Sequence, residues 1–272
     1  MNDSAVEKKL KQQAKSVEEN IPDVLKFPNS NGAKQSDELY NAAFKPIKPD
    51  HSCLIVGDTG VDAIALLDRG IFNVTSTNLE SNQIKFVRDH FGKDFSVGAE
   101  NAEKLSYAEN EFDWVICKES YHHFPRPPVA FYEFLRVAKK GVIFIEPLAA
   151  GFGLKWYLRA FIKSVLRGET IDDQRFEVSG NYVFGINLSE VYQMVTALEY
   201  KGYNYKYVNT TYLSKYSLRD DKFSRFIYKT VNNIQNAMTK LRLIDPGLVI
   251  LIISSDPISG YSYVKSPKNP FS

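Results

Sequence analysis

The chain has 272 residues, of which 44% are hydrophobic and 24% charged, and its formal net charge is +2. This composition indicates a globular protein with a sizeable core, built as one large domain with insertions. A charge so close to neutral argues against a nucleic-acid partner, since dedicated nucleic-acid binders are usually much more basic. No apolar run approaches the ~20 residues that a membrane-spanning helix needs.

The two cysteines and the N-terminal residues indicate in which cellular compartment the protein is expected. The two cysteines, Cys53 and Cys117, both lie in short apolar runs. Such positions predict core residues rather than a disulfide framework or a metal site. Residues 1–15 lack the apolar region of a secretory signal. We therefore expect a cytoplasmic protein without a bound metal.

Before residue 112 the chain alternates short apolar runs with helical stripes, which is typical of an α/β protein. A cap over 1–39, helical and polar at its start, is expected to precede the sheet. The expected elements are a polar helix over 1–26, a strand over 53–56, a helix over 61–67, a strand over 73–77, a helix over 81–90 and a short strand over 95–98.

Residues 112–147 are the most informative stretch of the sequence, FDWVICKESYHHFPRPPVAFYEFLRVAKKGVIFIEP. The unalternating runs at 115–117 and 142–145 predict two strands buried on both faces. Between them, apolar residues recur at helical spacing, and we expect Lys139, Lys140 and Gly141 to end that helix. Strand, helix and strand in this order predict a right-handed parallel unit. Ligands bind beyond the carboxyl ends of such strands, so residues 118–123 and Glu146 indicate a site.

After residue 147 the pattern predicts insertions and the end of the sheet. The expected segments are an insertion over 148–187 with a helix at 154–167, a helix over 188–200, strands over 205–213 and 248–254, a helical insertion over 216–244 between them, and a tail over 257–272 that is loose from residue 261.

This order of residues resembles the catalytic domain of class I S-adenosylmethionine-dependent methyltransferases. The shared features are the FD before an apolar strand, the loop with two histidines, the helix ending LRV and the strand ending EP. The resemblance implies a doubly wound, mostly parallel seven-stranded α/β sheet of Rossmann-like type, with helical insertions and an antiparallel last strand. Residues 40–147 would form its cofactor-binding half and residues 188–256 its C-terminal half.

The same resemblance implies S-adenosylmethionine as cofactor, although the sequence departs from the family pattern at three places. The VGDTG loop has two glycines instead of three, and Ile55 replaces an acid before it. Asn78 and Asn101 stand where the family has carboxylates for ribose and adenine, and Asp58 or Glu80 could supply the missing charge. Alternatively, the loop is a bare structural turn. The implied cofactor residues are Gly57, Asp58, Thr59, Gly60, Asn78, Leu79, Asn101, Ala102 and Lys118.

His122 and His123 are the candidate catalytic residues, because a neutral imidazole can take the proton of a hydroxyl acceptor. Adjacent side chains point apart, so at most one should face the acceptor, and we favour His123. The alternative is that both pack at the start of a helix.

Within the expected helix 154–167, Lys155, Arg159, Lys163 and Arg167 recur every four residues. This stripe is either a solvated face or a contact with an anionic, perhaps membrane-borne, partner. We therefore predict O-methylation of a small-molecule or glycan- or lipid-linked acceptor, with peripheral membrane contact through 154–167. The alternative is a catalytically inactive relative that serves binding or scaffolding. A nicotinamide-dependent oxidoreductase fits poorly, because its glycine spacing is not found.

Overall fold

The computed structural model describes residues 31–148, 182–209, 221–241, 243 and 246–269. The helices expected over 1–26 and 154–167 lie outside these ranges. The helix α3, Asn31–Ala43, runs across residue 40, where the cofactor-binding half was expected to begin.

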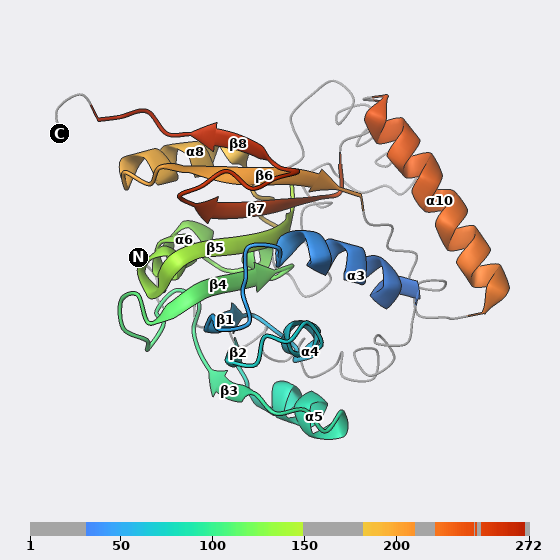
Figure 1. Ribbon diagram of the computed structural model, residues 1–272, viewed down its shortest axis with the longest axis horizontal. Helices are drawn as coiled ribbons and strands as arrows, with labels where there is room; N and C mark the ends of the chain where they lie inside the picture. The colour runs from blue at the N-terminus through green and yellow to red at the C-terminus, as the bar shows by residue number, and fades with distance from the viewer. Residues whose placement is uncertain (1–30, 149–181, 210–220, 242, 244–245, 270–272) are drawn as a thin grey trace.

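The described strands form one eight-stranded sheet in the order β3-β2-β1-β4-β5-β7-β6-β8 (Figure 1). Strands β1 to β5 pair in parallel, whereas β7 is antiparallel to both β5 and β6. The predicted doubly wound, mostly parallel sheet is thus confirmed. The strands are β1 Cys53–Val56, β2 Val74–Asn78, β3 Ser96–Ala99, β4 Phe112–Lys118, β5 Ala138–Pro147, β6 Gly202–Val208, β7 Leu248–Ser254 and β8 Ser262–Lys265.

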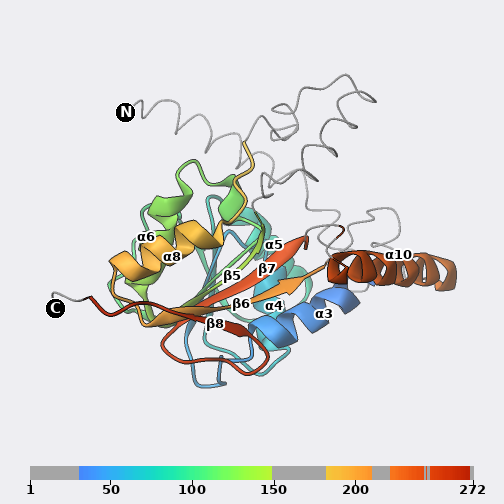
Figure 2. The ribbon, with the colours of Figure 1, turned by 90° about the horizontal axis from the view of Figure 1, so that it is seen from above.

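Helices cover both faces of the sheet (Figure 2). Helices α3, α4 and α5 share one apolar cluster, and α6 and α8 share the other. Neighbouring strand residues serve opposite clusters: Val115 packs with α6, and Ile116 packs on the α4 side. This two-sided burial explains why the strand sequences do not alternate. The other helices are α4 Val61–Leu67, α5 Asn82–His90, the 3-10 turn η2 Tyr121–His123, α6 Pro127–Val137, α8 Leu188–Ala197 and α10 Lys222–Lys240.

The predicted end of helix α6 is wrong. The helix ends at Val137, and Lys139, Lys140 and Gly141 belong to strand β5. A Cβ atom on Gly141 would lie 2.3 Å from the carbonyl oxygen of Ile253 and 2.8 Å from the Trp114 ring. This glycine is therefore needed because the sheet packs tightly there, and not because a helix ends there.

The predicted loose tail is also wrong in part. Residues 262–265 form β8, which pairs antiparallel with β6, so the sheet has eight strands rather than seven. The hydroxyl of Tyr263 donates to the carbonyl oxygens of Lys201 and Ser255. Strand β6 begins at Gly202, earlier than predicted, because β8 extends its outer edge and pairs with it from that residue.

Candidate active site

The loop after β1 packs closely against the β4 loop at Gly57 and against helix α5 at Gly60. Gly57 and Gly60 have φ angles of 80° and 98°, which favour glycine. A Cβ on Gly57 would lie 2.4 Å from the Cβ of Ser120, and one on Gly60 would lie 3.0 Å from Val87. Both glycines are thus required by the fold itself, whether or not a ligand approaches.

Asp58 caps helix α4 from within this loop. Its carboxylate accepts the backbone N–H groups of Asp62 at 3.2 Å and Ala63 at 3.1 Å, and the hydroxyl of Ser76 at 2.7 Å. The side chain is 1% exposed, and burial, with the charge of Asp62, raises its pKa to about 6. Because these groups surround the carboxylate, Asp58 does not replace the missing acid of the family. Glu80, the other candidate, is exposed.

The two asparagines hold the loops after β2 and β3. The amide of Asn78 donates to the carbonyl oxygen of Asp58 at 2.8 Å, while its own oxygen accepts the backbone N–H of Leu79. The oxygen of Asn101 accepts the backbone N–H of Glu103 at 3.0 Å. Asn78 therefore acts as donor and acceptor, whereas the bond recorded for Asn101 uses its acceptor oxygen.

A small cleft, open to solvent, lies beyond the carboxyl ends of β1, β2 and β3. Such an edge is where doubly wound proteins bind ligands. The predicted residues Gly57, Asn78, Leu79, Asn101 and Ala102 line it, and Asp58, Thr59, Gly60 and Lys118 do not. Its complete lining is Val56, Gly57, Asn78, Leu79, Glu100, Asn101, Ala102, Glu103, Phe124 and Pro125.

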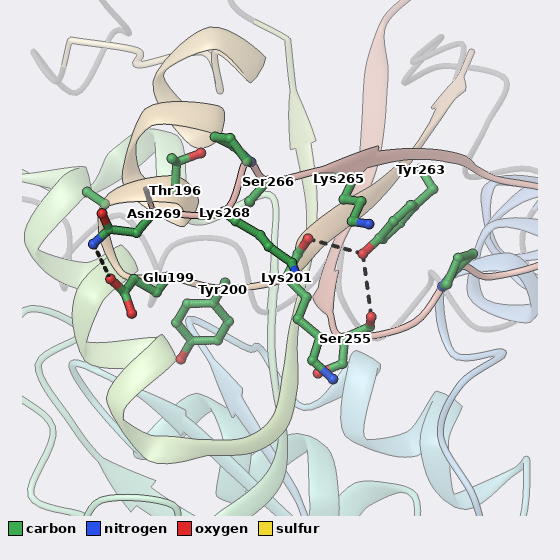
Figure 3. Close-up of a pocket in the computed structure, with 13 residues that line it drawn as sticks. Thr196, Glu199, Tyr200, Lys201, Ser255, Tyr263, Lys265, Ser266, Lys268 and Asn269 are labelled. Carbon is green, nitrogen blue, oxygen red and sulfur yellow. Dashed lines mark hydrogen bonds between the residues drawn. The ribbon is translucent and has the colours of Figure 1, made fainter. Parts of the chain in front are cut away.

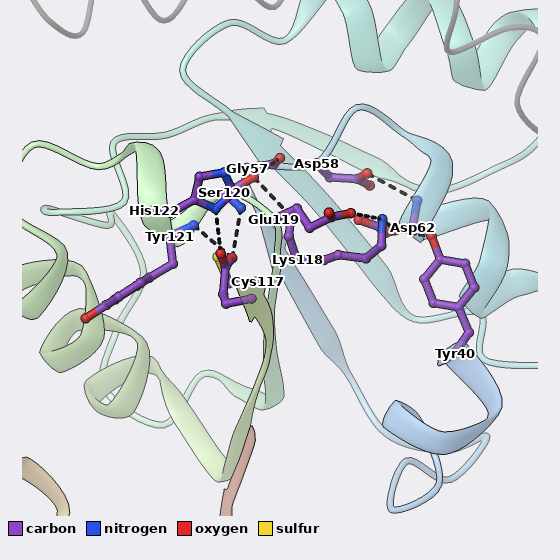
Figure 4. A network of polar contacts seen from close by, with 11 residues as sticks. Tyr40, Gly57, Asp58, Asp62, Cys117, Lys118, Glu119, Ser120, Tyr121 and His122 are labelled. Atoms are coloured by element: carbon purple, nitrogen blue, oxygen red, sulfur yellow. Dashed lines mark hydrogen bonds and ion pairs between the residues drawn. The ribbon is translucent and has the colours of Figure 1, made fainter. Parts of the chain in front are cut away.

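Lys118 points toward helix α3 rather than into this cleft (Figure 4). Its Nζ lies 3.4 Å from a carboxylate oxygen of Asp62, 3.4 Å from one of Glu119, and 5.5 Å from the ring centroid of Tyr40. The Tyr40 hydroxyl donates to Asp62, and burial raises the pKa of Tyr40 well above its usual value. Lys118 thus belongs to an ionic cluster that joins β4 to α3 and α4.

The loop after β4 is held by one carboxylate from the neighbouring strand. Glu146, at the end of β5, is fully buried. One of its oxygens accepts the backbone N–H groups of Ser120 at 2.8 Å and Tyr121 at 2.9 Å, and the other lies 2.7 Å from Nδ1 of His122 (Figure 4). A carboxylate can only accept here, so this contact places a proton on Nδ1 of His122.

The histidine pair lies next to the cleft. The ring centroids of His122 and His123 are 4.0 Å apart, and Phe124, the next residue, lines the cleft. The hydroxyl of Ser120 donates to the carbonyl oxygen of Gly57 at 2.7 Å, which ties this loop to the loop after β1. The fold therefore brings both predicted motifs to one edge.

Several residues of the site were not predicted. Glu100 and Glu103 line the cleft, and Glu103 is paired with Arg126 at 2.6 Å. Glu146 was noted as a strand-end acid, but its role in holding the loop was missed. The available signal was its position directly after a buried strand, where a carboxylate needs several donors.

A larger hollow lies at the opposite edge of the sheet, between α8 and the segment after β8 (Figure 3). Lys201, Lys265 and Lys268 line it together with Glu199, whose carboxylate accepts the side-chain amide of Asn269. The predicted site residues are all absent from its lining, so we place the candidate active site at the smaller cleft.

The fold is Rossmann-like, and the cleft lies at the edge of the sheet where doubly wound proteins bind ligands. A family model described as "Methyltransferase domain" matches residues 55–145. No curated protein matches the chain significantly. Residues 55–145 are therefore similar to a methyltransferase domain.

Solved structures share the fold at low sequence identity. A Haemonchus contortus phosphoethanolamine N-methyltransferase 2, solved with phosphomonomethylethanolamine and S-adenosylhomocysteine, is 13% identical with a TM-score of 0.52, over 82% of this chain and 53% of that one. The [4+2]-cyclase SpnF is 16% identical, with a TM-score of 0.51 over 79% of both chains. A chain from the Haloferax volcanii complex of a methyltransferase with its Trm112 activator is 13% identical, with a TM-score of 0.50 over 83% of this chain and 96% of that one. Because a cyclase is among them, the fold alone does not fix the reaction.

Proposed function

We propose that the protein is an S-adenosylmethionine-dependent methyltransferase acting on a small-molecule or glycan- or lipid-linked acceptor. The observation that carries this proposal is the cleft at the carboxyl edge of the sheet. Five residues that the family resemblance implied, coming from three different loops, line it together: Gly57, Asn78, Leu79, Asn101 and Ala102.

The lining has the chemistry that such a cofactor needs. Glu100 and Glu103 line the cleft, with their carboxylates bound to Ser106 and Arg126, and Leu79 and Phe124 add apolar surface for an adenine ring. When bound, the cofactor supplies a methyl group that is already activated for transfer.

We assign the role of general base to His122. Its Nδ1 is held by Glu146, and in a neutral imidazole Nε2 is the atom that would take the proton of an acceptor hydroxyl. The buried carboxylate both fixes the ring and stabilises the imidazolium that forms. His123 was the favoured base from sequence, but the 2.7 Å contact supports His122 instead. Such a base suits a hydroxyl acceptor, and on this ground we propose O-methylation.

One observation favours the alternative, a relative that has lost catalysis. The residue expected to bind ribose, Asn78, uses its amide and its oxygen within the protein. A methyltransferase domain whose ribose site is occupied in this way would keep the sheet and serve binding or scaffolding.

Isothermal calorimetry with S-adenosylmethionine and S-adenosylhomocysteine separates these two functions. We expect saturable binding by the wild-type chain and its loss in Ala102→Leu, which fills the cleft. Ala197→Leu is the matched control, because Ala197 lines the hollow at the opposite edge. Unfolding midpoints of both variants show whether they remain folded. Absence of binding by the wild-type chain would leave the inactive relative as the function.

A further inference from the structure

Helix α10 carries an unusual set of side chains. Residues 222–240 contain no Asp or Glu, but they include Lys222, Arg225, Lys229 and Lys240. Large apolar side chains are exposed along the same helix and just beyond its end: Phe223 at 66%, Phe226 at 66%, Ile234 at 55%, Met238 at 37% and Leu241 at 69%.

These apolar side chains share one face. Phe223, Phe226, Ile234 and Leu241 are spaced by three, eight and seven residues, which brings them to the same side of an α-helix. Ser224 and Tyr228 are buried and lie on another side. The helix thus packs on the protein through one face and presents a second, apolar face to solvent. Exposed apolar surface of this extent marks an interaction site.

The helix is fixed at the edge of the sheet that holds the cleft. Along the chain it follows β6 and precedes β7. Val208 of β6 pairs with Leu248 of β7, and Leu248 also pairs with Pro147 at the end of β5. Asn209 ties the helix to this edge through a 3.0 Å bond to Asn236 and a 3.3 Å bond from Thr239. Figures 1 and 2 show α10 extending from the body of the sheet.

We propose that α10 docks the protein on an anionic membrane surface, with the apolar face in the interface and the basic residues against lipid headgroups. An amphipathic helix with aromatic residues on one face, cations beside it and a low mean hydropathy is typical of interfacial binding. The complete absence of acidic residues from α10 complements a negative leaflet.

Docking through α10 is peripheral, since no described helix is long and apolar enough to cross a bilayer. Because α10 is tied to the carboxyl edge of the sheet, the membrane contact is made at the edge where the cleft also lies. The inference concerns binding alone and stands whether or not the protein transfers a methyl group.

The test is co-sedimentation of the full chain with vesicles of phosphatidylcholine alone or with about a third phosphatidylglycerol. We expect binding to the anionic vesicles only, weakened by added salt. The double variant Phe223→Ser/Phe226→Ser and the triple variant Lys222→Gln/Lys229→Gln/Lys240→Gln should each lose at least about tenfold in partition.

Two matched controls lie elsewhere on the surface. Phe72→Ser removes a phenylalanine that is 71% exposed, and Lys85→Gln removes an exposed lysine, so both should bind as wild type does. Circular dichroism and unfolding midpoints verify the fold of each variant.

Three outcomes would overturn the proposal. Equal binding to neutral vesicles would show that the basic residues do not matter. No binding to either kind of vesicle would show that a membrane is not the partner of α10. Sedimentation velocity covers the third: a lipid-free dimer that the Phe223→Ser/Phe226→Ser variant abolishes would make a second copy the occupant of this face.

Discussion

The loops after β1 and β4 meet at the hydrogen bond between Ser120 and Gly57, yet they are held in different ways. The β1 loop is held from within. Asp58 turns inward to cap α4, and Gly57 and Gly60 pack against side chains of other elements. Gly57, Asp58 and Gly60 therefore serve the packing and capping of the fold itself.

The β4 loop is held from outside, by a carboxylate of another strand. Glu146 takes two backbone N–H groups and the His122 ring, so the loop needs no glycine motif of its own. The recognisable glycine motif therefore mainly builds the site. The loop without a glycine motif positions the group that can exchange a proton.

The largest expected effect concerns the β4 loop. His122→Ala should lower turnover by about 10²–10⁴-fold with little change in cofactor affinity, because a base acts on the reaction and not on cofactor binding. His123→Ala should be mild, since the Glu146 contact is made by His122. The measurements are steady-state kinetics and calorimetry.

Glu146→Gln tests the positioning role in the same assay. Rate should fall at low pH in the wild type, because only neutral imidazole accepts a proton, and the substitution should change this profile as well as the rate. Equal, mild losses in His122→Ala and His123→Ala, with a flat pH profile, would make the pair structural.

The next effect concerns the β1 loop. Gly57→Ala should lower the free energy of unfolding by about 2–5 kcal/mol, because the new Cβ combines an unfavourable φ with an overlap with Ser120. Gly70→Ala is the control. Gly70 has a similar φ of 77° but nothing within 4 Å of its Cβ, so only the backbone cost of about 1 kcal/mol remains. Urea unfolding measures both, and equal losses would show that the contact with Ser120 is unimportant.

Sequence patterns predicted the sheet well because strands buried on both faces have short, unalternating apolar runs. They misplaced Gly141, since a glycine after a helical stripe indicates a helix end as readily as a tight contact with Trp114 and Ile253. They also missed β8, because Ser262–Lys265 pairs at an outer edge of the sheet and is only partly buried.

The sequence predicted where the residues of the candidate site lie better than it predicted which contacts they make. Family positions located Asn78 and Asn101 on the cleft. The inward turn of Asp58 and the contact between Glu146 and His122 depend on which strands are neighbours, and β4 and β5 are joined through a whole helix. Spacing along the chain does not carry that information.

The buried Asp58 makes stability depend on pH. Its folded-state pKa of about 6 lies above the usual 3.8, so its contribution to stability is fully present below about pH 3.8 and is lost as pH rises through 6. The loss is on the order of 2–3 kcal/mol. The side chain in Asp58→Asn does not titrate. Between about pH 4.5 and 7.5 the variant should therefore lose less unfolding free energy than the wild type does. Urea unfolding at both values checks this, and parallel pH profiles for wild type and variant would contradict it.

The smallest effect distinguishes the two asparagines that replace family carboxylates. In Asn78→Asp, an oxygen would replace the amide that donates to the Asp58 carbonyl, placing two acceptors about 2.8 Å apart near a buried acid. We expect a loss of about 1–3 kcal/mol in unfolding free energy. Asn101→Asp keeps the oxygen that accepts from Glu103, so its stability should change by less than about 0.5 kcal/mol. Calorimetry with S-adenosylmethionine, run on both, adds the functional half: tighter binding by a stable Asn78→Asp would show that the residue meets ribose and that its internal bonds give way to the ligand.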